Sequence, residues 1–356
     1  MTYFHPILFL LFTLTSFAQQ PYYTNGQNNV DFTLTGENLF DALQLKISNN
    51  TNAATYTYGD VRDDFEIMDI DPSNSNNVLL LYGFTNTISC TDGVTDRRIR
   101  DKDDFGGDNC EYNREHIFAR SNANPGMGST NNSFTGIVAD PHNLRACDVQ
   151  RNGTRGSKKF GAGSGNSSDV GSGYWYPGDE WIGDVARTMM YMYVRYGDRC
   201  LPDLNGFGPK EGTTEMLQIY LEWNALDPVS AIENNRNNHL ELVYGNRNPF
   251  IDNPYLAKSI WGGDEEPADI WGILNITDVV ASNFKITPNP TKDVVNITLP
   301  NNEETRLEIY TILGKRVYVR KVNTAISINI SSLKTGLYIF KFVQKNKTVT
   351  KKLVVR

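Results

Sequence analysis

The 356-residue sequence lacks the patterns of several common catalytic and metal-binding sites. It has four cysteines and four histidines, and no two cysteines have the CxxC spacing of a zinc knuckle. It contains no HExxH helix, no GxSxG elbow and no Walker loop. After the first twenty residues, no stretch has the roughly 18 consecutive apolar residues of a membrane helix. The sequence therefore argues against the usual zinc proteases, serine hydrolases and P-loop enzymes, and against a transmembrane segment in the mature chain.

The N-terminus, MTYFHPILFLLFTLTSFAQQ, predicts a secretory signal peptide over residues 1–18. An apolar run from Ile7 to Phe17 ends in Ser16-Phe17-Ala18, which places small residues at the −3 and −1 positions of a cleavage site. No Lys or Arg precedes the run, so a buried strand or an uncleaved anchor is the alternative. We expect export, with a mature chain that starts near Gln19.

Export into an oxidising compartment favours disulfides between the four cysteines, since their number is even. Four cysteines allow three pairings. We expect Cys90 to pair with Cys110, as a short staple, and Cys147 to pair with Cys200.

The composition changes near residue 263. Residues 263–282 are acidic and predict a linker, and short alternating strands separated by Asn-Pro and Gly turns follow from residue 283. From Ala281 onward there are 14 Lys/Arg and 4 Asp/Glu, a net charge of +10, so the rest carries (34 − 14) − (41 − 4) = −17. The sequence predicts a larger acidic domain over residues 19–262 and a small basic β-sandwich over residues 283–356.

The tail contains ITPNPTKDVVNI, IYTILGKRVY, TGLYIFKF and the basic ending KKLVVR. In these motifs it resembles the C-terminal sorting domain of the type IX secretion system of Bacteroidetes. The resemblance implies that this machinery carries the protein across the outer membrane, after the signal peptide has directed it through the inner membrane. It also implies removal of the tail and a location outside the cell or on its surface. An ordinary carbohydrate- or protein-binding sandwich is the alternative.

The larger domain predicts an α+β fold. Apolar spacing indicates helices over residues 34–47, 179–197 and 214–229, and residues 76–84 suggest a buried strand. Between them, residues 111–173 are rich in Gly, Asn and Ser and show little periodicity. Long irregular segments of compact domains are often functional.

Two clusters of polar residues lie in this irregular segment: EYNREHIFARSNANPG (111–126) and DPHNLRACDVQRNGTRGSKKF (140–160). A histidine can accept a proton near neutral pH. Glu and Asn supply oxygen ligands for a hard cation such as Mg²⁺, and Arg suits phosphate oxygens. The clusters thus combine the groups that phosphodiester hydrolysis requires.

With ARTMMYMYVRYG and residues 223–252, these motifs resemble the endonuclease I family of secreted bacterial nucleases, over most of residues 22–262. The resemblance implies a ββα-metal (His-Me finger) site in a mixed domain. It places the general base on His116 and the metal ligands on Glu115 and Asn152. It implies Mg²⁺, or another divalent ion such as Mn²⁺ or Ca²⁺.

Supporting roles follow from the same resemblance. His142 and Asn143 match a pair that supports the finger, and Arg120 and Arg155 are the candidates for a phosphate-binding arginine. Because neighbours on a regular strand point to opposite faces, Glu115 and His116 should lie at a strand end or a bulge.

The expected function is metal-dependent, sequence-nonspecific cleavage of DNA and/or RNA to 5′-phosphate products. A surface-displayed binding or adhesion protein on an inactive nuclease scaffold is the alternative. The acidic body argues against tight nucleic-acid binding, but seven basic residues could form a local basic cleft. They are Arg114, Arg120, Arg145, Arg151, Arg155, Lys158 and Lys159.

Three further possibilities stay open from the sequence. An aspartate-rich loop (Asp101, Asp103, Asp104, Asp108) could bind Ca²⁺ or be solvated. The aromatic stretch 173–181 could stack bases or pack in the core. A zinc site would have to combine His116, His142 and His239, which their spacing does not support. The sequence indicates no oligomeric state.

Overall fold

A computed structural model describes residues 20–49, 52–89, 95–272, 284–299, 302–311, 315–344 and 347–356. The predicted signal peptide, Cys90 and residues 273–282 of the predicted linker lie outside these ranges. The chain forms two compact units, divided between Gly272 and Ile273. Among the described residues, no helix is long and apolar enough to cross a membrane.

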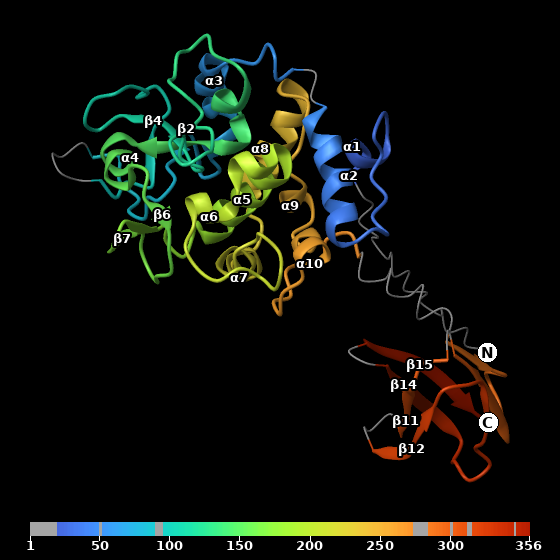
Figure 1. The fold of residues 1–356 in the computed structure, drawn as a ribbon. Coiled ribbons are helices and arrows are strands. Elements are labelled where there is room, and N and C mark those ends of the chain that lie inside the picture. Colours follow the sequence, from blue (N-terminus) through green and yellow to red (C-terminus); the bar gives the residue numbers. More distant parts are fainter. Residues whose placement is uncertain are drawn as a thin grey trace, which may run out of the picture. The chain divides into compact units, whose positions relative to one another are not determined.

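The first unit mixes helices with short sheets, so the α+β prediction is confirmed (Figure 1). Its helices are α1 (Pro21–Thr24), α2 (Gly36–Ser48), α3 (Tyr58–Met68), α4 (Val149–Arg155), α5 (Ile182–Tyr196), α6 (Pro202–Asn205), α7 (Gln218–Leu226), α8 (Ala231–Val243), α9 (Pro249–Asp252) and α10 (Leu256–Trp261). Its strands are β1 (Ile70–Asp71), β2 (Asn74–Leu79), β3 (Ile99–Asp101), β4 (Tyr112–His116), β5 (Leu144–Asp148), β6 (Lys159–Phe160), β7 (Ser168–Gly171) and β8 (Tyr174–Tyr176).

The three helices that apolar spacing predicted correspond to α2, α5 and α7. The longest helices that were not predicted are α3 and α8, although each begins with a capping box, Thr57/Asp60 and Ser230/Glu233. The strand predicted over residues 76–84 ends early: β2 stops at Leu79. Tyr82 has a left-handed backbone (φ 69°), which lies outside the conformations of a regular strand.

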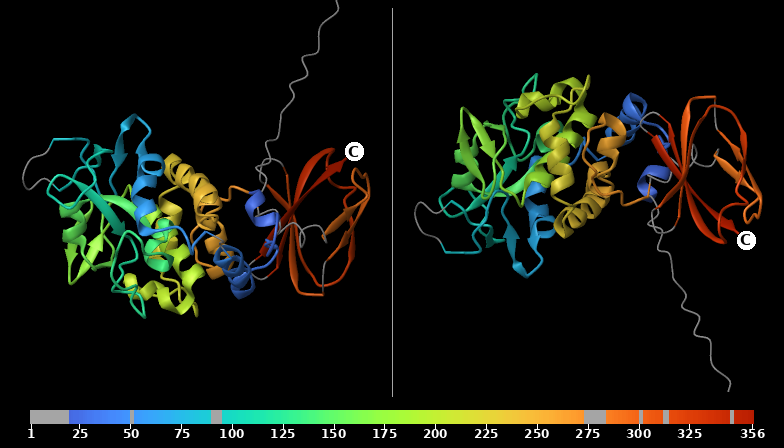
Figure 2. Two further views of the ribbon diagram at one scale, coloured as in Figure 1. Left: turned by 90° about the horizontal axis from the view of Figure 1, so that it is seen from above. Right: turned by 90° about the horizontal axis from the view of Figure 1, so that it is seen from below.

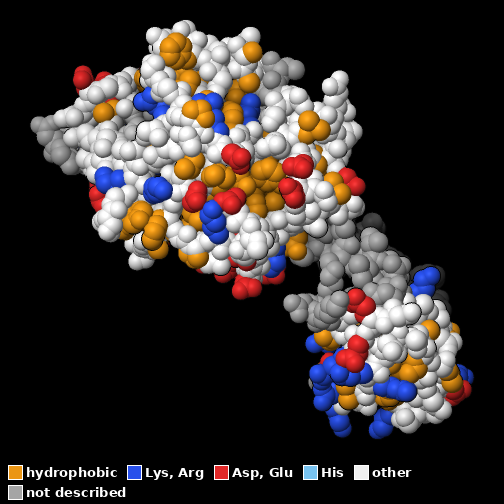
Figure 3. Space-filling view, viewed as in Figure 1, with side chains coloured by type: hydrophobic (Ala, Val, Ile, Leu, Met, Phe, Trp, Pro, Cys, Tyr) orange, Lys and Arg blue, Asp and Glu red, His pale blue; other side chains and the backbone are white. Residues whose placement is uncertain are grey.

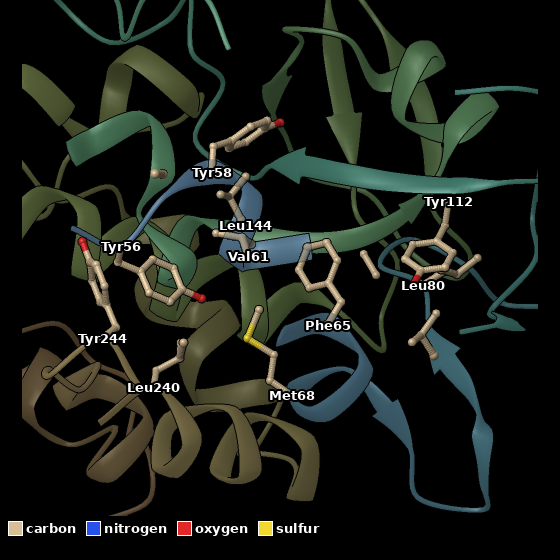
Figure 4. Packing of buried hydrophobic residues seen from close by; sticks show 13 residues of the cluster. Tyr56, Tyr58, Val61, Phe65, Met68, Leu80, Tyr112, Leu144, Leu240 and Tyr244 are labelled. Atoms are coloured by element: carbon tan, nitrogen blue, oxygen red, sulfur yellow. The ribbon is translucent and has the colours of Figure 1, made fainter. Parts of the chain in front are cut away.

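A hydrophobic cluster connects α3 and α8 to the strands that carry the polar motifs (Figure 4). Phe65 and Met68 of α3 are fully buried, as are Tyr112 of β4 and Leu144 of β5. Burying a side chain of this size contributes about 1.5–3 kcal/mol. The cluster therefore fixes the strand pair against the helical body.

The strand pair β4–β5 and helix α4 together form a ββα unit, called the finger below. The two strands are antiparallel, and their register runs without a bulge from Tyr112↔Asp148 to His116↔Leu144. Asp148 ends β5 and caps α4, because its Oδ1 accepts the N–H groups of Gln150 and Arg151, each at 3.0 Å. The finger lies at one end of the first unit, and α2, α9 and α10 lie at the other (Figures 1 and 2).

The second unit is an antiparallel sandwich, as the alternating pattern predicted. One sheet has the order β13-β10-β9 and the other β12-β11-β14-β15, with an apolar core between them. The strands are β9 (Lys285–Thr287), β10 (Val294–Thr298), β11 (Thr305–Thr311), β12 (Arg316–Val322), β13 (Ile326–Asn329), β14 (Gly336–Gln344) and β15 (Lys347–Val355).

The segment predicted as the first half of the linker is folded against the first unit. The ring of Trp271 packs against Phe32, with centroids 4.9 Å apart, and the Ile270 N–H donates to Asn253 Oδ1 at 2.9 Å. Its acidity and proline indicated a linker, but the aromatic contact anchors it.

The cysteines differ in part from expectation. Cys110 is disulfide-bonded, and Cys90, the partner predicted for it, lies outside the described residues, so that pairing stays a prediction. The predicted Cys147–Cys200 bridge is wrong, because both thiols are free and buried. They belong to different elements: Cys147 lies on β5 and donates to the Leu81 carbonyl at 3.4 Å, whereas Cys200 follows α5.

We therefore expect two thiols per chain on titration in denaturant without reductant, and none in the native protein. Burial raises the pKa of the Cys147 thiol well above its usual range and that of Cys200 to about 12, so neither forms the reactive thiolate before unfolding. A count of zero in denaturant would contradict the free pair, and a count of four would contradict the bridge at Cys110.

Candidate active site

A cavity of about 570 Å³ opens where β4 ends beside α4, and it brings together the predicted catalytic, metal-binding and phosphate-binding residues. These are Glu115, His116, Arg120, Asn152 and Arg155. Glu115 and His116 are adjacent on a strand yet reach the same cavity. No bulge produces this arrangement; instead, β4 ends at His116, which is one of the two irregularities that the sequence required.

His116 is buried, and its ring is fixed on two sides. Its Nε2 lies 2.9 Å from the carbonyl oxygen of Val138, and its ring stacks on Tyr58 with centroids 5.6 Å apart and planes 15° apart. A carbonyl can only accept, so Nε2 carries the proton and Nδ1 is left as an acceptor. Burial lowers the pKa of His116 to about 3, and three nearby arginines act in the same direction. The ring is therefore neutral near pH 7.

Glu115 is buried beside it, and only one of its two carboxylate oxygens is bonded to the protein. Oε1 accepts from the Tyr82 hydroxyl and from Arg155 Nη1, each at 3.1 Å. No hydrogen bond to Oε2 occurs within the part of the chain that the structure describes. Burial raises the pKa of Glu115 to about 7, although Arg155 and Tyr82 both act to lower it. A cation at the second oxygen would further favour the charged form.

Arg155, one of the two candidates for the phosphate-binding arginine, does not have the geometry of a phosphate-binding arm. Its side chain is fully buried, and besides Glu115 it donates to the carbonyls of His116 (3.0 Å) and Ile117 (2.7 Å). These are the last residue of β4 and the first residue beyond it. Arg155 thus ties the end of the strand to α4, and both of its terminal nitrogens, Nη1 and Nη2, already donate to protein oxygens.

Asn152 projects from α4 with its amide orientation fixed by the finger. Its Nδ2 donates to Asn113 Oδ1 at 2.7 Å and to the Arg114 carbonyl at 3.3 Å. This arrangement leaves Oδ1 without a hydrogen-bond partner among the described residues. Together with Glu115 Oε2, the cavity offers two uncommitted oxygen donors of the kinds that Mg²⁺ prefers, while Mg²⁺ keeps several waters. The residues present therefore fit a hard divalent ion.

The predicted basic cleft is smaller than the sequence indicated. Arg145 is buried and bridged to Asp184 at 2.5 Å, and Arg151 is buried and bonded to Ser167. Arg114 and Arg120 are the arginines of the set that line the cavity without being fully buried. Arg120 uses Nη1 on the Gly128 carbonyl (2.6 Å) and is half-buried, so it is the better of the two candidates for contact with phosphate.

His142 and Asn143 have structural positions, in the loop before β5. The Asn143 amide accepts from the Phe118 N–H (2.7 Å) and donates to its carbonyl (3.1 Å), which pins the chain just beyond His116. His142 Nε2 contacts Asn246 Oδ1 at 2.9 Å, and burial lowers the pKa of His142 to about 4. Neither side chain lines the cavity.

Sequence reasoning missed four residues of this site, because their contacts are long-range. Tyr58 stacks on His116, Tyr82 bonds Glu115, and Val138 accepts from His116 through a backbone atom that no motif could reveal. Asn205 donates to the Ile117 carbonyl at 2.9 Å from 88 residues away. No spacing in the sequence connects these positions.

The other possibilities are not supported by the described residues. Among them, no group of three or more His, Cys, Asp or Glu could hold a metal, so neither the aspartate loop nor a three-histidine zinc site is formed. His239 instead pairs with Asp64 at 2.8 Å. In the aromatic stretch, Trp175, Tyr176 and Trp181 are buried and belong to the core.

A second cavity of the first unit, of about 700 Å³, has the opposite character. Its lining includes Phe40, Tyr193 and Trp261, with carboxylates that include Glu37 and Asp41. On one face of this unit, acidic side chains surround an apolar patch (Figure 3). Such a lining repels phosphate, whereas the arginines of the first cavity attract it.

Comparisons with known proteins found matches for both units of the chain. The family model described as Endonuclease I matches residues 35–255, and the one described as secretion system C-terminal sorting domain matches residues 285–356. The chain is 38% identical over 245 residues to an extracellular ribonuclease of Bacillus subtilis (strain 168), covering 64% of this chain and 75% of that protein. An extracellular ribonuclease of Bacillus amyloliquefaciens is 37% identical over 244 residues, covering 64% of this chain and 74% of that protein.

We expect Arg155→Met to lower the free energy of unfolding of the first unit by about 3–5 kcal/mol at pH 8, because it leaves the buried Glu115 carboxylate without its cationic partner and removes a donor from two carbonyls. The loss should be smaller at pH 5, where Glu115 takes up a proton and carries no charge to bury. Urea unfolding followed by tryptophan fluorescence reports on this unit alone, because all five tryptophans precede residue 273.

The matched control is Arg120→Met, which removes a half-buried arginine of the same cavity and should cost no more than about 0.5 kcal/mol. Equal losses in the two variants would contradict the clamping role of Arg155.

Proposed function

This chain belongs to the endonuclease I family and ends in a secretion sorting domain, and we propose that it is a divalent-metal-dependent endonuclease that hydrolyses both DNA and RNA without sequence specificity. Membership of the family makes it a nuclease, and the sorting domain makes it one that is secreted or displayed on the cell surface. The observation that carries the proposal is the fixed tautomer of His116, beside two uncommitted oxygens.

His116 is the general base of the proposed reaction. The Val138 carbonyl holds the proton on Nε2, so Nδ1 can take a proton from water, and that water attacks the phosphorus. A pKa of about 3 keeps Nδ1 unprotonated across the physiological range. The low basicity of the His116 ring gives a modest driving force for proton transfer from water. The negative charge of a bound phosphate would raise that basicity.

Glu115 Oε2 and Asn152 Oδ1 would hold the divalent ion, with Mg²⁺ as the first candidate and Mn²⁺ or Ca²⁺ as alternatives. When bound, the ion would stabilise the charge that develops on the phosphate and on the departing 3′ oxygen. Asn113 and the Arg114 carbonyl orient the amide, and Tyr82 and Arg155 orient the carboxylate, so the donors are positioned before any ion arrives.

Water as the nucleophile determines the products and the range of substrates. When it attacks phosphorus and the 3′ oxygen leaves, the phosphate stays on the 5′ side of the next nucleotide. The 2′-hydroxyl takes no part, so DNA and RNA are both cleavable. Arg120 would pair with a non-bridging phosphate oxygen, which provides contact without reading a base.

We expect His116→Ala to lower kcat on plasmid DNA about 10²-fold or more, the usual contribution of a general base, while Mg²⁺ affinity measured by calorimetry is retained. Asn152→Ala should weaken Mg²⁺ binding as well as the rate, and Asn113→Ala should do so to a smaller degree. EDTA should abolish cleavage by the wild type.

Two results would sink the proposal. One is wild-type cleavage by His116→Ala. The other is cleavage that EDTA leaves untouched. Absence of any cleavage, with nucleic acid still bound, would favour the binding or adhesion protein instead.

The pH dependence of cleavage should arise from the pH dependence of metal binding rather than from titration of His116. The raised pKa of Glu115 means that the carboxyl is protonated below about pH 7, so Mg²⁺ affinity should fall as the pH drops, by up to tenfold per unit. Added Mg²⁺ should restore the rate at pH 6. If kcat at saturating Mg²⁺ still fell with a midpoint near 6.5, His116 would have an ordinary pKa, contrary to the burial of its ring.

A further inference from the structure

A cavity of about 450 Å³ lies beside the catalytic one and is not used by the chemistry described above. The two share Gly128 in their linings. The neighbouring cavity is also lined by Val138, whose carbonyl holds the His116 proton. The two cavities therefore adjoin each other at Gly128.

Phe134 lines this neighbouring cavity and is 42% exposed, so its ring is accessible to a ligand there. Its backbone is firmly held: the Phe134 carbonyl accepts from the Tyr58 N–H at 2.7 Å, and its N–H donates to the Asn131 carbonyl at 2.9 Å. Tyr58 is the residue that stacks on His116. Tyr58 thus contacts both the backbone of Phe134 and the ring of the proposed general base.

The same loop is tied to the arginine side of the catalytic cavity. Asn132 Oδ1 accepts from Arg114 Nη1 and Nη2, each at 3.1 Å, and Asn131 Oδ1 accepts from the Ser133 N–H and hydroxyl, each at 3.0 Å. A loop with these contacts is preorganised. Binding to it costs little ordering of the protein.

The lining of the neighbouring cavity contains no charged side chain. Besides Phe134 it offers the hydroxyls of Ser129 and Thr135, the thioether of Met127 and backbone. The arginine-lined cavity attracts phosphate, whereas this uncharged surface does not. Its phenyl ring and hydroxyls fit a neutral, planar, aromatic group with polar edges. Hydroxyls both donate and accept, and therefore do not select one base edge over another.

We propose that this cavity is a nucleobase subsite in which one base next to the scissile phosphate stacks on Phe134. The inference rests on the proposed nuclease function and adds a substrate contact to it. A base can reach the ring only if it leaves its neighbours in the strand, so the subsite favours single-stranded or locally unpaired nucleic acid over regular duplex.

The test uses short single-stranded DNA in which one ordinary phosphodiester lies between nuclease-resistant linkages. Each nucleotide near that bond is replaced in turn by an abasic sugar. In the wild type, removal of the contacted base should lower kcat/KM about 5- to 150-fold, the range for stacking on one aromatic side chain. Phe134→Ala should show that loss with the intact strand and no further loss when the base is absent.

Three variants make the comparison specific. Phe134→Trp should retain the effect of the base, because it keeps a stacking surface. Phe207→Ala removes another exposed phenylalanine, 58% exposed and outside both cavities, and should behave as the wild type. Phe134→Ala should unfold at the wild-type temperature, because Phe134 contributes to the loop's hydrogen bonds through its backbone, which the substitution retains.

The outcomes separate this subsite from the chemistry. If Phe134→Ala cleaves the intact and abasic strands with wild-type kcat/KM, the subsite is wrong while the nuclease mechanism stands. If no single base matters in the wild type, the subsite is also wrong. A wild type that cleaves no strand at all, with or without Mg²⁺, overturns the proposed function and the subsite with it.

Discussion

The buried contact between Arg155 and the end of β4 is the interaction on which the site depends. One guanidinium, contributed by the last residue of α4, bonds the Glu115 carboxylate and the carbonyls of His116 and Ile117. Burying such an ion pair costs desolvation free energy, and hydrogen bonds to further partners offset part of that cost. Here the carbonyls of His116 and Ile117 accept from the guanidinium. The same contact ends the strand at His116, so that a carboxylate and an imidazole from adjacent residues reach one cavity.

The surroundings of the two side chains give them different roles. The Glu115 carboxyl has its pKa raised by burial and keeps one oxygen uncommitted, so in the proposed mechanism it can bind a cation. The His116 ring has its pKa lowered by burial, and the Val138 carbonyl fixes its proton on Nε2. Both shifts have the same physical cause, which is the loss of solvation of the charged form. Opposite charge types respond to it in opposite directions.

Sequence patterns predicted those parts of the molecule that depend on local periodicity. The apolar spacing of α2 and α5 and the alternation in the tail were sufficient for these elements. The resemblance to the endonuclease I family assigned Glu115, His116 and Asn152 to one site, and all three line the same cavity. Contacts between distant segments were beyond such reasoning. Arg155 was a candidate for phosphate contact because the sequence could not show its burial.

The same limit explains the other differences. A pairing of Cys147 with Cys200 was plausible by count alone, but the fold places them on separate elements. The acidic composition before the sorting domain predicted a linker, but the contact of Trp271 with Phe32 anchors its first half to the first unit. Tyr58 lies 58 residues before His116, and no local pattern indicates that their rings stack. Packing, which the sequence specifies only collectively, decided each case.

The most direct test of the account is the protonation state of His116 in solution. Nitrogen-15 NMR of histidine-labelled full-length protein, with the resonances assigned through His116→Ala, distinguishes the two ring nitrogens. The account predicts a neutral ring protonated on Nε2, with no titration between pH 5 and 8. A ring protonated on Nδ1, or one that titrates near pH 6.5, would contradict it.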